Sequence, residues 1–158
     1  MSASPAALQP PRLTVASLVR DGQGRMLFVE EEIEGRLVLN QPAGRLERGE
    51  SLVAAAERET LEETGWEIAV EALVGVYQWR DARRHTVRFA FAARPRRHHP
   101  GRRLDAAIRR VLWLDDAAFR SHPVPPRSPL VARCLEDFLA GHRLPLEAVL
   151  RDLPGGGR

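Results

Sequence analysis

Three glutamates near the middle of the chain have a spacing that suits metal chemistry. The stretch 52–64 contains neither glycine nor proline, so we expect it to form a helix. On a helix that turns about 100° per residue, Glu62 lies roughly 60° to one side of Glu59 and Glu63 roughly 40° to the other. Like charges at these spacings repel, and the last turn of a helix already carries partial negative charge. We therefore predict that a hard divalent cation, Mg²⁺ or alternatively Mn²⁺, offsets these carboxylates.

A glutamate-rich helix can also be a solvated acidic face, and the flanking residues decide between the two interpretations. Gly44 is followed after five residues by Glu50 and, after seven more, by Arg58-Glu59-x-x-Glu62-Glu63-x-Gly65. This pattern resembles the Nudix box. Thr60 and Trp66 stand where the family has an aliphatic residue, but both departures concern packing, and every charged position and both glycines match.

The resemblance implies a metal-dependent hydrolase that cleaves phosphoanhydride bonds. It implies that Glu59, Glu62 and Glu63 are metal ligands, with the carbonyl oxygen of Ala43 as a further candidate. The metal ions would bridge diphosphate oxygens and lower the pKa of an attacking water. Arg58 lies four residues before Glu62, so we expect it to hold the carboxylates in position.

The reaction also needs a general base. In the Nudix family the base is either a glutamate of the box, here Glu59 or Glu62, or an acidic residue on a later loop. Asp105 is the only carboxylate between Asp81 and Asp115. The alternative interpretation of Asp105 is a loop aspartate that is solvated or caps a turn.

Three short segments outside the box resemble the NudJ-type phosphatases of the same family: 39–44, 77–79 and 127–131. That resemblance implies activity on nucleoside tri- and diphosphates and on hydroxymethylpyrimidine diphosphate, with release of inorganic phosphate. The residues that would contact the substrate are Gln41, Tyr77, Trp79, Arg84, Arg88 and Arg127.

The side chains themselves are consistent with a flat, anionic substrate. Tyr77 and Trp79 lie on the same side of an expected strand and can stack on a ring, although two aromatics at this spacing also suit a core. Arg84 and Arg88 are candidates for phosphate contacts, against the alternative of solvated surface charges. Arg127 precedes the last helix, whose start favours anions; the alternative is an ion pair that docks the helix.

The elements that must position these residues can be read from periodicity and turn signals. We expect a β-hairpin of 13–19 and 26–29 around the turn 21–24, and a short strand at 37–39 followed by a loop at 40–44. Ser51 should cap the helix 52–64, and Gly65 should end it. Further expected elements are strands at 68–79, 85–93 and 111–114, a basic loop at 94–103, and a helix at 128–140 with an apolar stripe of Leu130, Val131, Cys134, Leu135 and Leu139.

This order of strands and helices predicts an α/β fold, and the family resemblance implies an α/β/α sandwich with a mixed β-sheet. We expect a disordered leader at 1–11, one Nudix domain at 12–151 and a disordered tail at 152–158.

Composition limits the class of protein. The 158 residues are 44% apolar and 28% charged, which suits one globular domain. No apolar run approaches the roughly 20 residues of a membrane span, and residues 1–11 lack the positive-then-apolar order of a signal peptide. We therefore expect a cytoplasmic monomer or homodimer with a small phosphorylated substrate. The single cysteine, Cys134, lies in an apolar stripe and is expected to be buried filler.

Three rival functions are weaker. A hydrolase of ADP-ribose, dinucleoside polyphosphates or oxidised nucleotides stays open, but the proline that ADP-ribose enzymes carry after the box is missing before Pro95. A nucleic-acid-binding protein is suggested by the isoelectric point near 10.2 and by arginines of the loop 94–103. That loop interleaves no aromatics, the net charge is only +3, and we expect no nucleic-acid partner. A catalytically silent Nudix module would have lost glutamates of the box.

Overall fold

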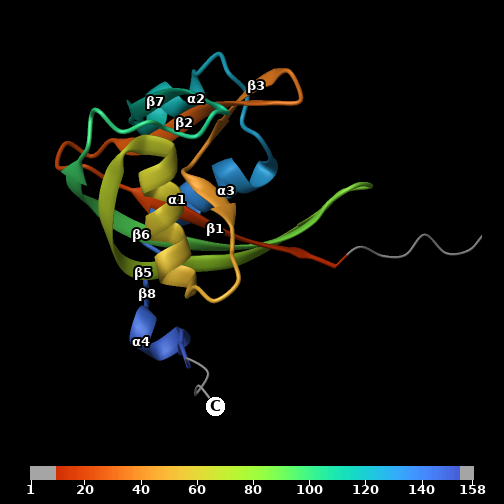
Figure 1. Ribbon diagram of the computed structural model, residues 1–158, viewed down its shortest axis with the longest axis vertical. Helices are drawn as coiled ribbons and strands as arrows, with labels where there is room; N and C mark the ends of the chain where they lie inside the picture. The colour runs from red at the N-terminus through yellow and green to blue at the C-terminus, as the bar shows by residue number, and fades with distance from the viewer. Residues whose placement is uncertain (1–9, 154–158) are drawn as a thin grey trace, which may run out of the picture.

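The computed structural model describes residues 10–153, which form two β-sheets and four helices (Figure 1). Most of the expected leader 1–11 and tail 152–158 lies outside the described residues. The elements follow in the order β1 (Arg12–Val19), β2 (Met26–Ile33), β3 (Arg36–Asn40), β4 (Ala43–Arg45), α1 (Leu52–Thr64), β5 (Trp66–Arg80), β6 (His85–His98), β7 (Ile108–Leu114), α2 (Asp116–Arg120), α3 (Pro129–Leu139), β8 (Leu144–Pro145) and α4 (Leu146–Val149).

The larger sheet carries the site. Its strand order is β4-β1-β6-β5-β8, and a second sheet has the order β3-β2-β7. Strands β1 and β6 pair in parallel, whereas β4, β5 and β8 join in antiparallel fashion. The sheet is therefore mixed, and the predicted α/β fold class is confirmed.

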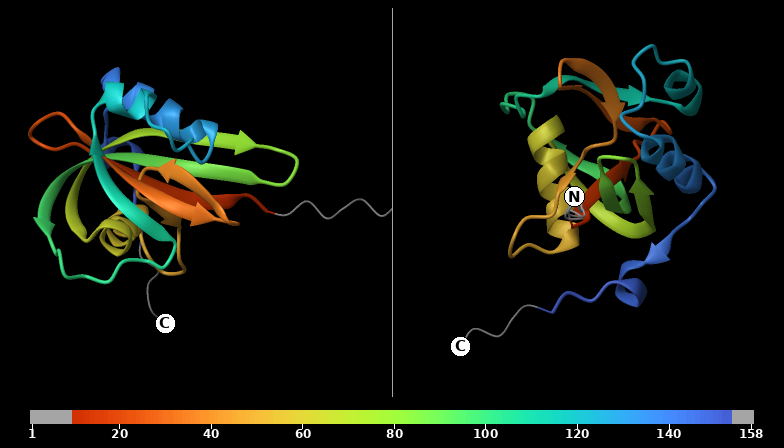
Figure 2. Two further views of the ribbon diagram at one scale, coloured as in Figure 1. Left: turned by 90° about the horizontal axis from the view of Figure 1, so that it is seen from above. Right: turned by 90° about the vertical axis from the view of Figure 1, so that its right-hand side faces the viewer.

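The two long helices cover opposite faces of the larger sheet (Figure 2, left). On the α1 side, Val15 of β1 and Phe91 of β6 pack with Ala55. On the α3 side, Leu18 and Ala90 of the same strands join a cluster that contains Leu135. Because both faces are covered, β1 is buried without interruption from Val15 to Val19.

The predicted opening hairpin is wrong, although its turn exists. Asp21 Oδ1 accepts hydrogen bonds from the backbone N–H groups of Gln23 and Arg25, and one isolated bridge joins Arg20 to Met26. Beyond that bridge β1 pairs with β4 and β6, and β2 pairs with β3 and β7. Both strands are buried on both faces, and such strands are continuous apolar runs that do not indicate which strand pairs with them.

The two predicted long helices are confirmed. Ser51 caps α1 by accepting from Ala54 N–H, and Gly65 ends it in the left-handed conformation, with φ 74° and its N–H bonded to Leu61 O. Helix α3 begins after Ser128 and buries Cys134 completely. One residue of the apolar stripe predicted for this helix is wrong, because Leu139 is 42% exposed and Phe138 is buried instead.

The two departures from the box have packing roles. Thr60 is fully buried, and its hydroxyl donates to Ala56 O at 2.8 Å and lies 2.9 Å from the Ser17 hydroxyl of β1. Trp66 stacks on His98 with ring centroids 4.5 Å apart and meets Trp113 edge-on. Both residues therefore fasten α1 and the following strand to their neighbours.

Two predicted loops are partly strand. The loop 40–44 contains the start of β4, which adds to the edge of the larger sheet beside β1. Half of the basic loop 94–103 continues β6, where 94–98 pairs with 66–69 of β5. Helices α2 and α4 and strand β8 were not predicted, and each spans five residues or fewer. None of the helices within residues 10–153 is long and apolar enough to cross a membrane.

Candidate active site

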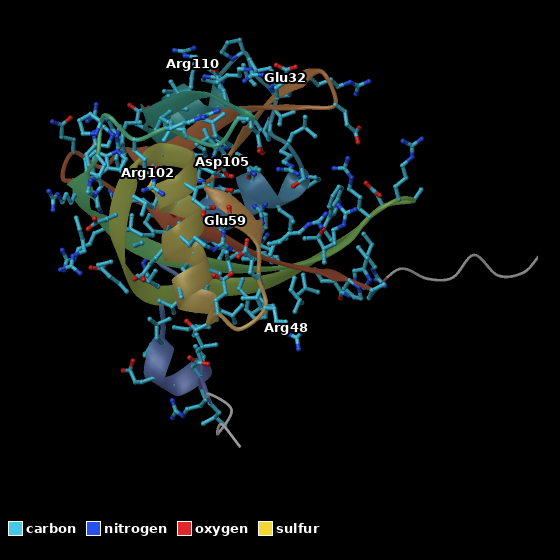
Figure 3. The ribbon with its side chains drawn as sticks, in the orientation of Figure 1. Glu32, Arg48, Glu59, Arg102, Asp105 and Arg110 are labelled. Carbon is cyan, nitrogen blue, oxygen red and sulfur yellow. The ribbon has the colours of Figure 1, made fainter. Side chains whose placement is uncertain are left out.

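Helix α1 and the segment before β7 bring three carboxylates together. Glu59, Glu62 and Asp105 each offer an oxygen within 4.8 Å of the other two. Asp105 is held at the helix because its N–H donates to Glu62 O at 3.0 Å, and Figure 3 shows it beside α1 near Glu59. A set of three carboxylate oxygens is the kind of site that Mg²⁺ or Mn²⁺ prefers. We name these three residues the carboxylate cluster.

Glu63 lies on the inner side of the carboxylate cluster. It is only 6% exposed, and its Oε2 accepts from the N–H of Ala43 at 3.0 Å. Burial raises the pKa of Glu63 well above its ordinary value, and the nearby carboxylates of Glu31, Glu59 and Asp105 raise it further. A cation at the cluster would relieve this repulsion, so the residues present fit a divalent metal ion.

Arg58 ties the carboxylates to the loop before the helix. Its guanidinium donates to Glu50 at 2.8 and 2.9 Å, to Glu59 at 2.9 Å and to Glu62 at 3.1 Å. A further bond reaches Arg45 O of β4 at 3.1 Å. The predicted ion pair with Glu62 is confirmed. The partnership with Glu50 was not foreseen, although the box places a glutamate there.

Gly44, the first residue of the box, must be a glycine because the Glu59 side chain lies directly against it. A Cβ on Gly44 would overlap the carboxyl group of Glu59. Gly44 also lines a cavity on the other side of β4. Because Gly44 has no side chain, the cavity and the carboxylate cluster can lie on the two sides of β4 at this residue.

That cavity has a volume of about 120 Å³ and lies between the larger sheet and the start of α3. Its floor comes from neighbouring positions of three strands, since Arg88 of β6 pairs with Thr14 of β1, which pairs with Arg45 of β4. We call it the ring cavity. The residues that line it are Arg12, Thr14, Asn40, Ala43, Gly44, Arg45, Trp79, Arg84, Thr86, Arg88, Arg127, Ser128 and Leu130.

Four of the six residues predicted to contact substrate line the ring cavity: Trp79, Arg84, Arg88 and Arg127. The other two have partners inside the protein. Gln41 is 1% exposed, and its amide donates to Val131 O at 2.8 Å and accepts from Arg88 at 3.3 Å. The Tyr77 hydroxyl donates to Asp137 at 2.9 Å, and its ring packs on the core under α3.

Two residues of the site escaped the sequence analysis. Buried Glu31 of β2 accepts from Arg127 at 2.8 Å and from the Asn40 amide at 3.0 Å. The ion pair considered for Arg127 therefore exists, at the same place where Arg127 reaches the ring cavity. The available signal was the run 30–32, three glutamates in an otherwise apolar strand. The partner of Glu31, Arg127, lies 96 residues away, which no local pattern reveals.

Comparison with known proteins decides the family. Residues 10–133 match the family described as NUDIX domain. The chain belongs to the Nudix family.

The relatives of this Nudix chain point to hydrolases. It is 36% identical over 141 residues to proteins named Phosphatase NudJ from Escherichia coli K12 and from Shigella boydii, covering 88% of this chain and 90% of theirs. Among solved structures, a NUDIX hydrolase from Nitrosomonas europaea has 39% identity and a TM-score of 0.88, covering 93% of this chain and all of the other. The chain is a Nudix hydrolase, similar to the NudJ phosphatases.

Proposed function

We propose that this Nudix hydrolase is a Mg²⁺-dependent phosphatase of nucleoside tri- and diphosphates or of hydroxymethylpyrimidine diphosphate. The observation that carries the proposal is the placement of the ring cavity and the carboxylate cluster on the two sides of β4 at Gly44. A diphosphate that extends from a ring in the cavity passes β4 toward the cluster. The NudJ phosphatases to which the chain is similar support the release of phosphate.

The metal is proposed to be held by Glu59, Glu62 and Glu63, with Asp105 beside them and the Ala43 carbonyl as a further ligand. Mg²⁺, or alternatively Mn²⁺, would supply charge neutralisation at the transferred phosphoryl group and a more acidic bound water. Arg58 keeps Glu59 and Glu62 in one arrangement by donating to both.

The general base is proposed to come from the carboxylate cluster. Burial raises the pKa of Glu59, and the neighbouring charges of Glu62 and Asp105 raise it further, whereas the contacts of Arg58 lower it. A raised pKa suits a group that must accept a proton near neutral pH. Asp105 is the alternative, because it is exposed and belongs to the same cluster.

The substrate ring is proposed to stack on Trp79, with Arg84 and Arg127 near the phosphates or the sugar. Gln41 and Tyr77 act indirectly in this proposal. Gln41 anchors the guanidinium of Arg88 to α3 through Val131 O, and Tyr77 braces the same helix through Asp137.

The test is a panel of nucleotides and pyrimidine diphosphates incubated with Mg²⁺, with phosphate and pyrophosphate assayed separately. A triphosphate should yield its diphosphate and orthophosphate, and ¹⁸O from labelled water should appear in the orthophosphate. Glu59→Gln is the control for metal-site activity. Pyrophosphate as the sole first product from a triphosphate would refute the phosphatase proposal and favour a Nudix pyrophosphohydrolase of another substrate, such as ADP-ribose.

The location and assembly of the protein stay predictions from sequence. We propose a cytoplasmic monomer or homodimer that acts on small phosphorylated molecules and not on nucleic acid. Light scattering after size-exclusion chromatography distinguishes the two assembly states.

A further inference from the structure

Two buried polar atoms among residues lining the ring cavity lack a hydrogen-bond partner. They are Oδ1 of Asn40 and Nε of Arg88. Asn40 is 1% exposed and Arg88 5%. Buried polar atoms are nearly always paired with protein or with ordered water, so an unpaired acceptor and an unpaired donor beside one cavity leave two partners to come from outside the chain.

Arg88 is the more unusual of the two. Within residues 10–153 it has no carboxylate within salt-bridge distance, and its hydrogen bond to Gln41 is a long one to a neutral oxygen. The adjacent thiol of Cys134 does not neutralise it, because burial raises the pKa of that thiol to about 11. A buried guanidinium with an unpaired N–H group is costly, so an acceptor from outside the chain is the natural complement of Nε.

The orientation of the Asn40 amide follows from its neighbour. Its Nδ2 donates to the Glu31 carboxylate, which can only accept, and Arg127 holds that carboxylate from a second direction. Exchanging the oxygen and nitrogen of the amide would set two acceptors against each other. Oδ1 is therefore the atom left over, and it requires a donor.

We propose that Asn40 and Arg88 recognise two neighbouring groups on the edge of the substrate's ring. Oδ1 of Asn40 accepts a hydrogen bond from a donor of the ring, and Nε of Arg88 donates one to an adjacent acceptor. The inference rests on the proposed function for the position of the ring. A cavity of about 120 Å³ approaches the roughly 150 Å³ that binds benzene in an engineered protein, so it has room for about one six-membered ring. Cytosine and other 4-aminopyrimidines present the required pair, an amine beside a ring nitrogen.

The test uses two triphosphates that differ in one group: cytidine triphosphate and its analogue with pyrimidin-2-one, which lacks the 4-amino donor. The analogue leaves Oδ1 of Asn40 unpaired. We expect kcat/KM to fall at least tenfold, mainly through KM. In Asn40→Leu the two substrates should differ by less than twofold. Gln78→Leu also replaces a side-chain amide with leucine, at an exposed position of β5, and should keep the full difference.

Binding of the monophosphates separates this inference from the proposed function, because they contain no phosphoanhydride bond. Calorimetry should give at least tenfold tighter binding of cytidine monophosphate than of the monophosphate with pyrimidin-2-one, which lacks only the 4-amino group. That difference without hydrolysis of any nucleoside triphosphate, nucleoside diphosphate or pyrimidine diphosphate would refute the proposed function and support the recognition of the ring. Equal affinities would overturn the inference even if hydrolysis proceeds.

Arg88→Met supplies a second readout, since methionine fills much of the same volume without the charge. Binding of both monophosphates should weaken at least tenfold, while the thermal midpoint rises because a buried unpaired charge is gone. A lower midpoint with unchanged affinity would show that Arg88 only supports the fold, and would overturn its assignment.

Discussion

Replacing Gly44 with alanine should damage catalysis far more than stability. The added Cβ would overlap the carboxyl group of Glu59, which is the far end of a flexible side chain and can move. Regaining ordinary van der Waals contact of 3.4 Å displaces the carboxyl carbon by about 1.4 Å, and a misplacement of about 1 Å already costs on the order of 100-fold in rate. Arg58, bonded to the same carboxylate at 2.9 Å, would be drawn along.

The assay is phosphate release at saturating substrate together with a thermal melt. We expect kcat of Gly44→Ala to fall about 100-fold, with a midpoint within a few degrees of the parent. Gly101→Ala is the matched control, because a Cβ there meets nothing within 4 Å. A Gly44→Ala enzyme that retains a third of the parent kcat would refute the reasoning that the glycine exists to admit Glu59.

Three further predictions concern the carboxylates. Glu63→Gln should lower kcat at least about 100-fold, yet raise the thermal midpoint in EDTA at pH 8. The folded pKa of Glu63 is raised above 4.5, so its ionisation costs the metal-free protein stability as pH rises through that pKa, and a midpoint at or below the parent's contradicts this. Millimolar Mg²⁺ should raise the parent midpoint by mass action, and an equal shift in Glu59→Gln, Glu62→Gln would place the cation elsewhere. Asp105→Asn should lower kcat about tenfold or more at an unchanged midpoint, whereas a turn-capping role would lower the midpoint alone.

The sequence predicts those parts of the fold that depend on neighbours in the chain. Ser51 and Gly65 mark the two ends of α1 because capping is a local interaction. The pairing of β1 with β6 could not be predicted, since a strand buried on both faces carries no signal of which strand lies beside it. The pattern of apolar residues therefore identified the strands, but it did not predict which strands pair with each other.

The same division applies to the site. Glu59 and Glu62 share a helix, so their proximity was foreseeable, whereas Asp105 was only a candidate until the structure placed it beside them. Gln41 was expected at the substrate because it belongs to a resembling segment, yet its direction depends on Val131, 90 residues away. The bond of Asn40 to Glu31 likewise depends on tertiary structure, since the two lie on paired strands.

The parallel junction of β1 and β6 has a consequence for the order of folding. Strands β5 and β6 are joined by a short turn, so their pairing closes only a small loop and is expected early. Val15 must find Phe89, 74 residues along the chain, whereas its partner in β4, Gly44, is only 29 residues away. The parallel junction of β1 and β6 is therefore expected to form after β4 has joined β1. Amide exchange should nevertheless be fast at β4, because this short strand lies at the edge of the larger sheet.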